Sequence, residues 1–169
     1  MLILLVALFF VTACEDQKIL EPKSTASPSP TTSATTSEGQ IHEHCTRAGN
    51  VNGGSSDLSY EIYYTGDRLN RVESKETVIS DQSSVLDTYE EAYRTLHSYY
   101  KNIDYYYTEV VREDNYVTSI IQIDYDHVDA DTLLALEGED NNIYENKIPK
   151  ISKFKDLAKK VGMSCTEVS

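Results

Sequence analysis

The stretch of sequence that decides the fold is LSYEIYYTGD, at residues 58–67. Its alternate side chains are apolar or aromatic, namely Leu58, Tyr60, Ile62 and Tyr64. This period of two predicts a strand with one buried face. Thr65-Gly66-Asp67 predicts a tight turn, and a second strand is expected from Arg68 to about Ile79. Leu69 and Val72 in that second strand are out of phase by one residue, so we expect a bulge near Asn70.

After Asp87 the apolar positions recur every three or four residues, which predicts an amphipathic helix. These positions are Tyr89, Ala92, Tyr93, Leu96, Tyr100 and Ile103. Asp87 or Thr88 is the expected N-cap, because both residue types accept hydrogen bonds from the first free amides of a helix. His97 falls among the solvent-facing positions and is expected to be a plain surface histidine.

Three further strands are expected. A hairpin joins strands at 105–112 and 116–126. The second of these is rich in Ile and Val on both faces, which is typical of a central strand. A short strand is expected at 45–48, before a glycine-rich loop.

Two helices follow the hairpin. The first, at 129–136, is expected to be capped by Asp129 and closed by Gly138. The second, at 152–161, is expected to be capped by its first residue and to stop at Gly162. The order of all these elements predicts an α+β fold, with an antiparallel β-sheet of about four or five strands and two or three helices packed on one face.

The N-terminal residues resemble an export signal. Residues 1–13 carry no charge and are mostly aliphatic or aromatic, which is typical of the apolar region of a signal peptide, and they are too few to span a membrane. Val11-Thr12-Ala13-Cys14 is similar to the lipobox of bacterial lipoproteins, so Cys14 is predicted to carry lipid. The alternative is a plain secretory peptide with a chance cysteine. No Lys or Arg precedes the apolar run, which departs from the usual signal.

A change of composition follows Cys14. Thirteen of the sixteen residues from Pro22 to Ser37 are Ser, Thr or Pro, and such a segment cannot bury a core. Residues 14–40 are therefore predicted to be a disordered tether, and 41–169 a single α+β domain. The lipid would hold this domain on the extracytoplasmic side of the bacterial cell membrane. With 28 acidic and 15 basic residues the chain has a formal charge of -13, which argues against a nucleic-acid partner.

The order of these parts resembles the YehR-like family of small bacterial lipoproteins of unassigned function. The resemblance covers nearly all of residues 58–168. It rests on Tyr60-Glu61-Ile62-Tyr63-Tyr64, on Gly66-Asp67, on Ile123-Asp124-Tyr125, on the helix with Leu133, Leu134 and Leu136, and on the last helix leading to Gly162. The resemblance implies a lipidated cysteine and an α+β domain, and it supplies no catalytic residues. This chain departs from the simplest members in having Cys45 and Cys165 and a longer tether.

Two cysteines remain once Cys14 is assigned to lipid. The extracytoplasmic compartment permits oxidation, and domain termini often lie close together, so we predict a disulfide between Cys45 and Cys165. The competing hypothesis makes Cys45 a metal ligand with His42 and His44, which alternate on one side of the same strand. The companion ligands for a closed site are not evident, so no metal is expected.

An acidic cluster lies near the end of the predicted central strand. It comprises Asp124, Asp126, Asp129 and Asp131 around His127, and hard cations such as calcium favour such oxygens. The glycine and terminal glutamate of an EF-hand loop are missing, so we interpret Asp129 as a helix cap and its neighbours as a solvated strand end. The chain also lacks a Gly-x-Ser-x-Gly elbow, and we expect neither an enzyme nor a cofactor.

The chain has thirteen tyrosines and no tryptophan. Because only one sheet face can be covered by helices, at least three of five tyrosines are expected to be solvent accessible, the five being Tyr63, Tyr64, Tyr106, Tyr107 and Tyr116. Exposed tyrosines suit binding, whereas cross-strand pairing would only stabilise the sheet. We therefore predict a non-enzymatic binding module that contacts membrane lipid through Cys14 and an envelope protein or polymer through these tyrosines. The alternative is a cell-envelope enzyme or a metal-handling lipoprotein.

Overall fold

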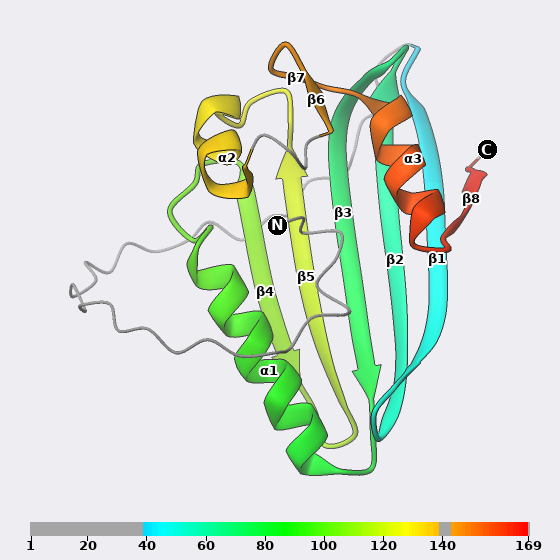
Figure 1. Ribbon diagram of the computed structural model, residues 1–169, viewed down its shortest axis with the longest axis vertical. Helices are drawn as coiled ribbons and strands as arrows, with labels where there is room; N and C mark the ends of the chain where they lie inside the picture. The colour runs from blue at the N-terminus through cyan, green and yellow to red at the C-terminus, as the bar shows by residue number, and fades with distance from the viewer. Residues whose placement is uncertain (1–38, 139–142, 169) are drawn as a thin grey trace.

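Figure 1 shows the fold in a computed structural model that describes residues 39–138 and 143–168. The predictions for the signal peptide, for Cys14 and for nearly all of the tether lie outside the described residues. The described chain is an α+β domain with a six-stranded sheet, a small two-stranded sheet and three helices. None of these helices has the length and apolar character needed to cross a membrane.

The large sheet has the strand order β4-β5-β3-β2-β1-β8, and every neighbouring pair is antiparallel. Its strands are β1 Ile41–Val51, β2 Gly54–Thr65, β3 Arg68–Ile79, β4 Tyr106–Arg112, β5 Tyr116–Asp124 and β8 Ser164–Glu167. β6 (Tyr144–Glu145) pairs with β7 (Ile148–Pro149) in the small sheet.

The large sheet has more strands than the four or five predicted. The missed strand is β8, whose sequence Ser-Cys-Thr-Glu has no apolar alternation and whose side chains are all exposed. The short strand expected at 45–48 is part of β1, which has eleven residues. The predicted central position of β5 is confirmed, because it lies between β3 and β4.

The β2–β3 hairpin has the predicted turn and bulge. Tyr63 pairs with Arg71 and Tyr64 with Leu69, which leaves Asn70 as the extra residue. Asn70 is buried, and its side-chain amide donates to both carboxylate oxygens of Asp126 at 3.1 Å. The bulge is therefore held by polar contacts that satisfy the displaced residue.

The three helices lie on the same face of the sheet, in front of the strands in Figure 1. They are α1 Ser83–Ser98, α2 Ala130–Glu137 and α3 Ile151–Lys160. The predicted caps of α2 are confirmed, since the Asp129 carboxylate accepts a hydrogen bond from the Asp131 amide and Gly138 follows the last residue with a φ of 81°. α3 begins one residue before the predicted Ser152, because both backbone and side-chain oxygens of Asp67 accept its first amides at 3.1 Å.

The prediction for α1 was wrong in its start and in the exposure of His97, whereas the predicted buried positions are confirmed as buried or half-buried. The helix begins at Ser83, with Gln82 as N-cap, instead of at Asp87 or Thr88. Its buried side chains are Leu86, Tyr93 and His97. His97 lies four residues after Tyr93, on the same side of the helix, and is 7% exposed, so it faces the sheet instead of solvent.

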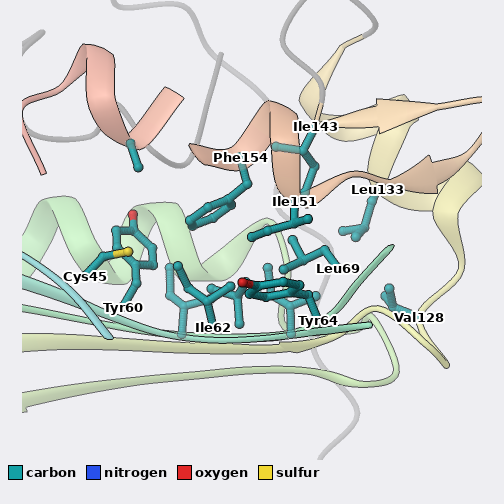
Figure 2. Close-up of a cluster of buried hydrophobic side chains, with 14 of the residues drawn as sticks. Cys45, Tyr60, Ile62, Tyr64, Leu69, Val128, Leu133, Ile143, Ile151 and Phe154 are labelled. Atoms are coloured by element: carbon teal, nitrogen blue, oxygen red, sulfur yellow. The ribbon is translucent and has the colours of Figure 1, made fainter. Parts of the chain in front are cut away.

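The core lies between the sheet and the helices. Figure 2 shows its larger part, where side chains of β2 and the start of β3 meet α2, α3 and the segment around Ile143. A smaller cluster beneath α1 consists of Val78, Leu86, Tyr93 and Val117. Both clusters use the helix-covered face, so the opposite face of the sheet is free of helices in the described chain.

Candidate interaction surface

The open face of the sheet is formed by strand residues that alternate with the buried core positions. Pairing across the strands arranges them in rows. One row contains His42, Tyr63, Arg71 and Asp124. The next contains His44, Glu61, Glu73, Gln122 and Tyr107. We call this whole helix-free side the open face.

The five singled-out tyrosines divide between the two faces. Tyr63, Tyr107 and Tyr116 lie on the open face and are half-buried. Tyr64 and Tyr106 are buried on the helix side, 7% and 6% exposed. The prediction that Tyr64 and Tyr106 belong to the binding surface was wrong, because adjacent residues of a strand point to opposite faces of the sheet.

Tyr63 is held in a stack at one end of the open face. The His42 ring lies 4.3 Å from the Tyr63 ring with an interplanar angle of 10°, and the Arg71 guanidinium lies 5.1 Å from the Tyr63 ring centre. Arg71 also pairs with Glu73 at 3.0 Å. Partial burial raises the pKa of Tyr63, and the Arg71 charge lowers it in part. The stack presents aromatic and cationic surface in a fixed arrangement.

His42 and His44 share one carboxylate. His42 Nε2 and His44 Nδ1 each lie 2.7 Å from a different oxygen of Glu61, which projects from the neighbouring strand. Glu43 and Cys45, in contrast, are buried on the helix side. The run from His42 to Cys45 is therefore split between the two faces, and its four side chains do not form one metal site.

The other end of the open face is hollowed by a shallow depression of about 290 Å³. Its lining is largely apolar at Ile79, Val111, Tyr116 and Ile120, with Lys75, Thr77, Asn115 and Thr118 completing it. Ile79 is 39% exposed there. The open face thus combines an aromatic stack at one end with an apolar depression at the other.

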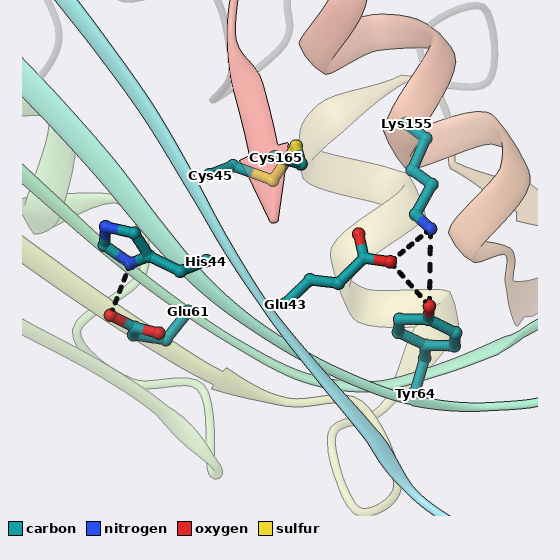
Figure 3. The surroundings of a disulfide bond; sticks show 7 residues. All are labelled: Glu43, His44, Cys45, Glu61, Tyr64, Lys155 and Cys165. Carbon is teal, nitrogen blue, oxygen red and sulfur yellow. Dashed lines mark hydrogen bonds and ion pairs between the residues drawn. A yellow bond between two sulfur atoms is a disulfide. The ribbon is translucent and has the colours of Figure 1, made fainter. Parts of the chain in front are cut away.

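Figure 3 shows the helix side of β1, where Cys45 and Cys165 pair. Their sulfur atoms are 2.00 Å apart, a separation compatible with the predicted disulfide. Nearby, Glu43 Oε1 accepts hydrogen bonds from Lys155 Nζ at 2.6 Å and from the Tyr64 hydroxyl at 2.7 Å. Burial alone would raise the pKa of Glu43, but these two donors hold it below its usual value.

Glu43, Cys45 and Cys165 bring potential metal ligands within 4.8 Å of one another. Both sulfur atoms are committed to the disulfide, however, so a thiolate site would require its reduction.

The acidic cluster does not converge on one point. The Asp126 carboxylate accepts hydrogen bonds from Arg68 and Asn70, and the Asp124 carboxylate is hydrogen-bonded to His127. Asp129 caps α2, and Asp131 accepts a hydrogen bond from Lys147. Each carboxylate thus has a partner of its own, which favours the interpretation as a helix cap and a solvated strand end over a calcium site.

Sequence reasoning missed three contacts, namely Glu61 beside both histidines, Lys155 beside Glu43, and His97 beside Ser119. His97 Nε2 lies 2.9 Å from Ser119 Oγ. The pKa of His97 is lowered to about 4, mainly because the ring is buried and to a smaller extent because of the charge of Arg94. The alternation of His42 and His44 was the only local signal for any of them.

Fold and surface define a small α+β domain with one helix-covered and one open sheet face. Among solved structures, the chain is similar to the NMR structure of the E. coli YehR protein, with 18% identity, 78% of this chain and 95% of that chain covered, and a TM-score of 0.55. The NMR structure of a Streptococcus pneumoniae TIGR4 protein matches with 13% identity, 90% and 100% coverage, and a TM-score of 0.49. No protein-family model and no curated protein matches the chain. The comparison with YehR therefore establishes a common fold.

Proposed function

We propose that the protein is a membrane-anchored extracytoplasmic lipoprotein that acts as a non-enzymatic binding module. Its open face docks a folded protein of the cell envelope. The observation that carries this proposal is the placement of Tyr63, Tyr107 and Tyr116 on the sheet face that the described helices leave uncovered. The anchor rests on the lipobox-like residues before Cys14 and on the Ser/Thr/Pro-rich tether.

The chemistry of the open face favours a protein partner. Tyrosine and arginine are enriched where binding energy concentrates in protein interfaces, because they bury a large area and keep a polar end. Tyr63 and Arg71 are already stacked, so less side-chain freedom is lost when a partner binds.

The size of the open face also agrees with that of an ordinary protein–protein interface. From strand spacing and rise, its width is roughly 20 Å and its length roughly 35 Å. This is close to the roughly 800 Å² that each partner contributes to an ordinary protein interface. The shallow depression beside Tyr116 can accommodate one apolar side chain of the partner.

The test is affinity capture from envelope extract with the full-length chain and its Tyr63→Ser/Tyr107→Ser variant. We expect the variant to capture the partner at least fivefold less, with a nearly unchanged melting temperature, because both rings lie outside the core. Tyr99→Ser is the matched control, since Tyr99 is 64% exposed at the end of α1 and off the open face.

Three results would contradict the proposal. Equal capture of the partner by the wild-type chain and by Tyr63→Ser/Tyr107→Ser would exclude the open face as the docking surface. Capture that survives protease treatment of the extract would assign the partner to an envelope polymer instead of a protein. A large loss of stability with unaltered capture would make Tyr63 and Tyr107 structural residues.

A further inference from the structure

The sheet ends at β4, whose outer side has no strand beside it in the described chain, since β4 pairs only with β5. The backbone amide of Glu113 donates to the carbonyl of Tyr116 at 2.9 Å. At the other end of the pair, the amide of Asp124 donates to the carbonyl of Tyr105 at 3.0 Å. Hydrogen-bonded positions alternate along an antiparallel strand, so the odd-numbered residues of β4 direct their backbone groups to β5.

The even-numbered residues Thr108, Val110 and Arg112 direct their backbone N–H and C=O groups away from the sheet. None of these backbone groups has a hydrogen-bond partner among the described residues. β4 also contains no proline and pairs with β5 without a register shift, so it lacks two features that usually protect an edge strand. A row of free backbone groups on such an edge is a template for one more strand.

One flank of α1 lies beside this edge. The Arg112 guanidinium of β4 lies 3.4 Å from Asp87 and 3.8 Å from Glu90, and both carboxylates belong to α1. Figure 1 shows α1 alongside β4. A groove of about 540 Å³ follows the same flank and is lined by Asp87, Glu90, Glu91, Arg94, Thr95 and Ser98. A strand added to β4 would therefore lie next to this groove.

The surroundings of the edge carry an excess of negative charge. Arg94 in the groove is already paired with Glu90 at 2.7 Å. Glu91 is exposed and has no ion pair in the part of the chain that the structure describes. Glu109, on β4 itself, is also exposed, and the only group hydrogen-bonded to its carboxylate there is the neutral Tyr107 hydroxyl. The whole chain has a formal charge of -13, so the edge favours a basic strand.

We propose that the outer edge of β4 binds an extended, basic segment of a partner protein as an additional strand of the sheet. The backbone of this segment pairs with Thr108, Val110 and Arg112, and its alternate lysine or arginine side chains lie beside the carboxylates of Glu91 and Glu109. Backbone pairing provides the affinity, and charge selects the sequence. The site uses the edge of the sheet, so it is separate from the open face on which the proposed function depends.

The probe is a short capped peptide of alternating lysine and threonine. Isothermal titration of the full-length chain should show saturable binding of this peptide and none of its counterpart with glutamate in place of lysine. A lysine peptide with methyl groups on alternate backbone nitrogens should bind about tenfold more weakly or worse, since it cannot donate to the edge. Hydrogen exchange followed by NMR should slow at the amides of Thr108, Val110 and Arg112 when the unmodified lysine peptide is bound.

Variants of the chain test the two parts of the site. Thr108→Pro removes one outward N–H and no hydrogen bond to β5, so it should weaken binding about tenfold, whereas Thr108→Val keeps the amide and should bind normally. Glu91→Lys should weaken binding of the lysine peptide. Asp156→Lys is its matched control, because Asp156 is exposed on α3, a different helix, and the change of charge is the same. The methylated peptide tests backbone pairing even if Thr108→Pro lowers the melting temperature.

The proposal is overturned if the lysine peptide does not bind saturably, or if the methylated peptide binds as tightly as the unmodified one. Equal binding of the lysine and glutamate peptides would overturn the assignment to a basic segment. Slow exchange at Thr108, Val110 and Arg112 in the chain without peptide would show that the edge is already occupied, by another segment of this chain or by a second copy, and would overturn the proposal as well.

Discussion

Cys45 and Cys165 lie directly opposite each other on β1 and β8, with their Cα atoms 3.9 Å apart although 120 residues separate them along the chain. β8 pairs only with β1 in the sheet and forms its edge. The disulfide therefore ties an exposed, polar strand to one whose Cys45 is fully buried.

Removing this cross-link should destabilise the domain strongly. In the chain-entropy model, a closed loop of about 120 residues contributes roughly 5 kcal/mol, so Cys45→Ala/Cys165→Ala should lower the free energy of unfolding by up to that amount. Urea unfolding measures the loss, and Cys14→Ala serves as control. Two alkylated thiols in the non-reduced protein kept under air would contradict the disulfide itself.

The buried His97 should make the domain less stable in mild acid. Its pKa is lowered to about 4, below the ordinary 6.5 of the unfolded chain, so the unfolded state takes up the proton first. The stabilising effect of neutral His97 is complete above about pH 6.5. As the pH falls from there to about 4, roughly 3 kcal/mol should be lost.

The difference in unfolding free energy between wild type and His97→Gln isolates this effect. Glu137, whose pKa burial raises to about 7, stabilises the folded state as the pH falls, but it does so in both proteins. His127→Gln is the control, because His127 is exposed. A difference that does not change between about pH 7 and pH 4.5 would show that His97 does not titrate as described.

Lys155 and Glu43 should be energetically coupled. Lys155→Met leaves the buried Glu43 carboxylate with only the Tyr64 hydroxyl, and we expect a loss of about 1–2 kcal/mol, since the partly exposed lysine is screened by solvent. The pKa of Glu43 is lowered from 4.5, so this contribution is present above that pH and disappears as the pH falls through the lowered value.

A double-mutant cycle with Glu43→Gln tests the coupling by urea unfolding at neutral and acidic pH. Additive losses at neutral pH would mean that the contact in Figure 3 adds nothing to stability.

Cys14 should hold the protein on the membrane. Two or three acyl chains give stable anchoring where one is marginal, at about 0.8 kcal/mol for each buried methylene. Cys14→Ser should therefore move the protein to the soluble fraction, as followed by immunoblotting after fractionation. A Cys14→Ser protein that stays with membranes after a high-salt wash would refute the lipoprotein prediction.

The sequence by itself determined the elements that depend on neighbouring residues. The β2–β3 hairpin follows from strict alternation around Gly66, and its bulge follows from the one-residue shift of Leu69 against Val72. Asp129 and Gly138 mark the ends of α2, because capping involves only adjacent amides and carbonyls.

Only the tertiary structure decided which surfaces these elements present. His97 borders the predicted apolar stripe of α1, and only the packing of the helix against β5 places its ring beside Ser119 and buries it. β8 has no strand pattern of its own, and its pairing depends on β1 and Cys45. Glu61 reaches both histidines only through strand pairing. Contacts between distant segments leave no local trace in a sequence, because they arise only when a compact chain excludes water from a shared core.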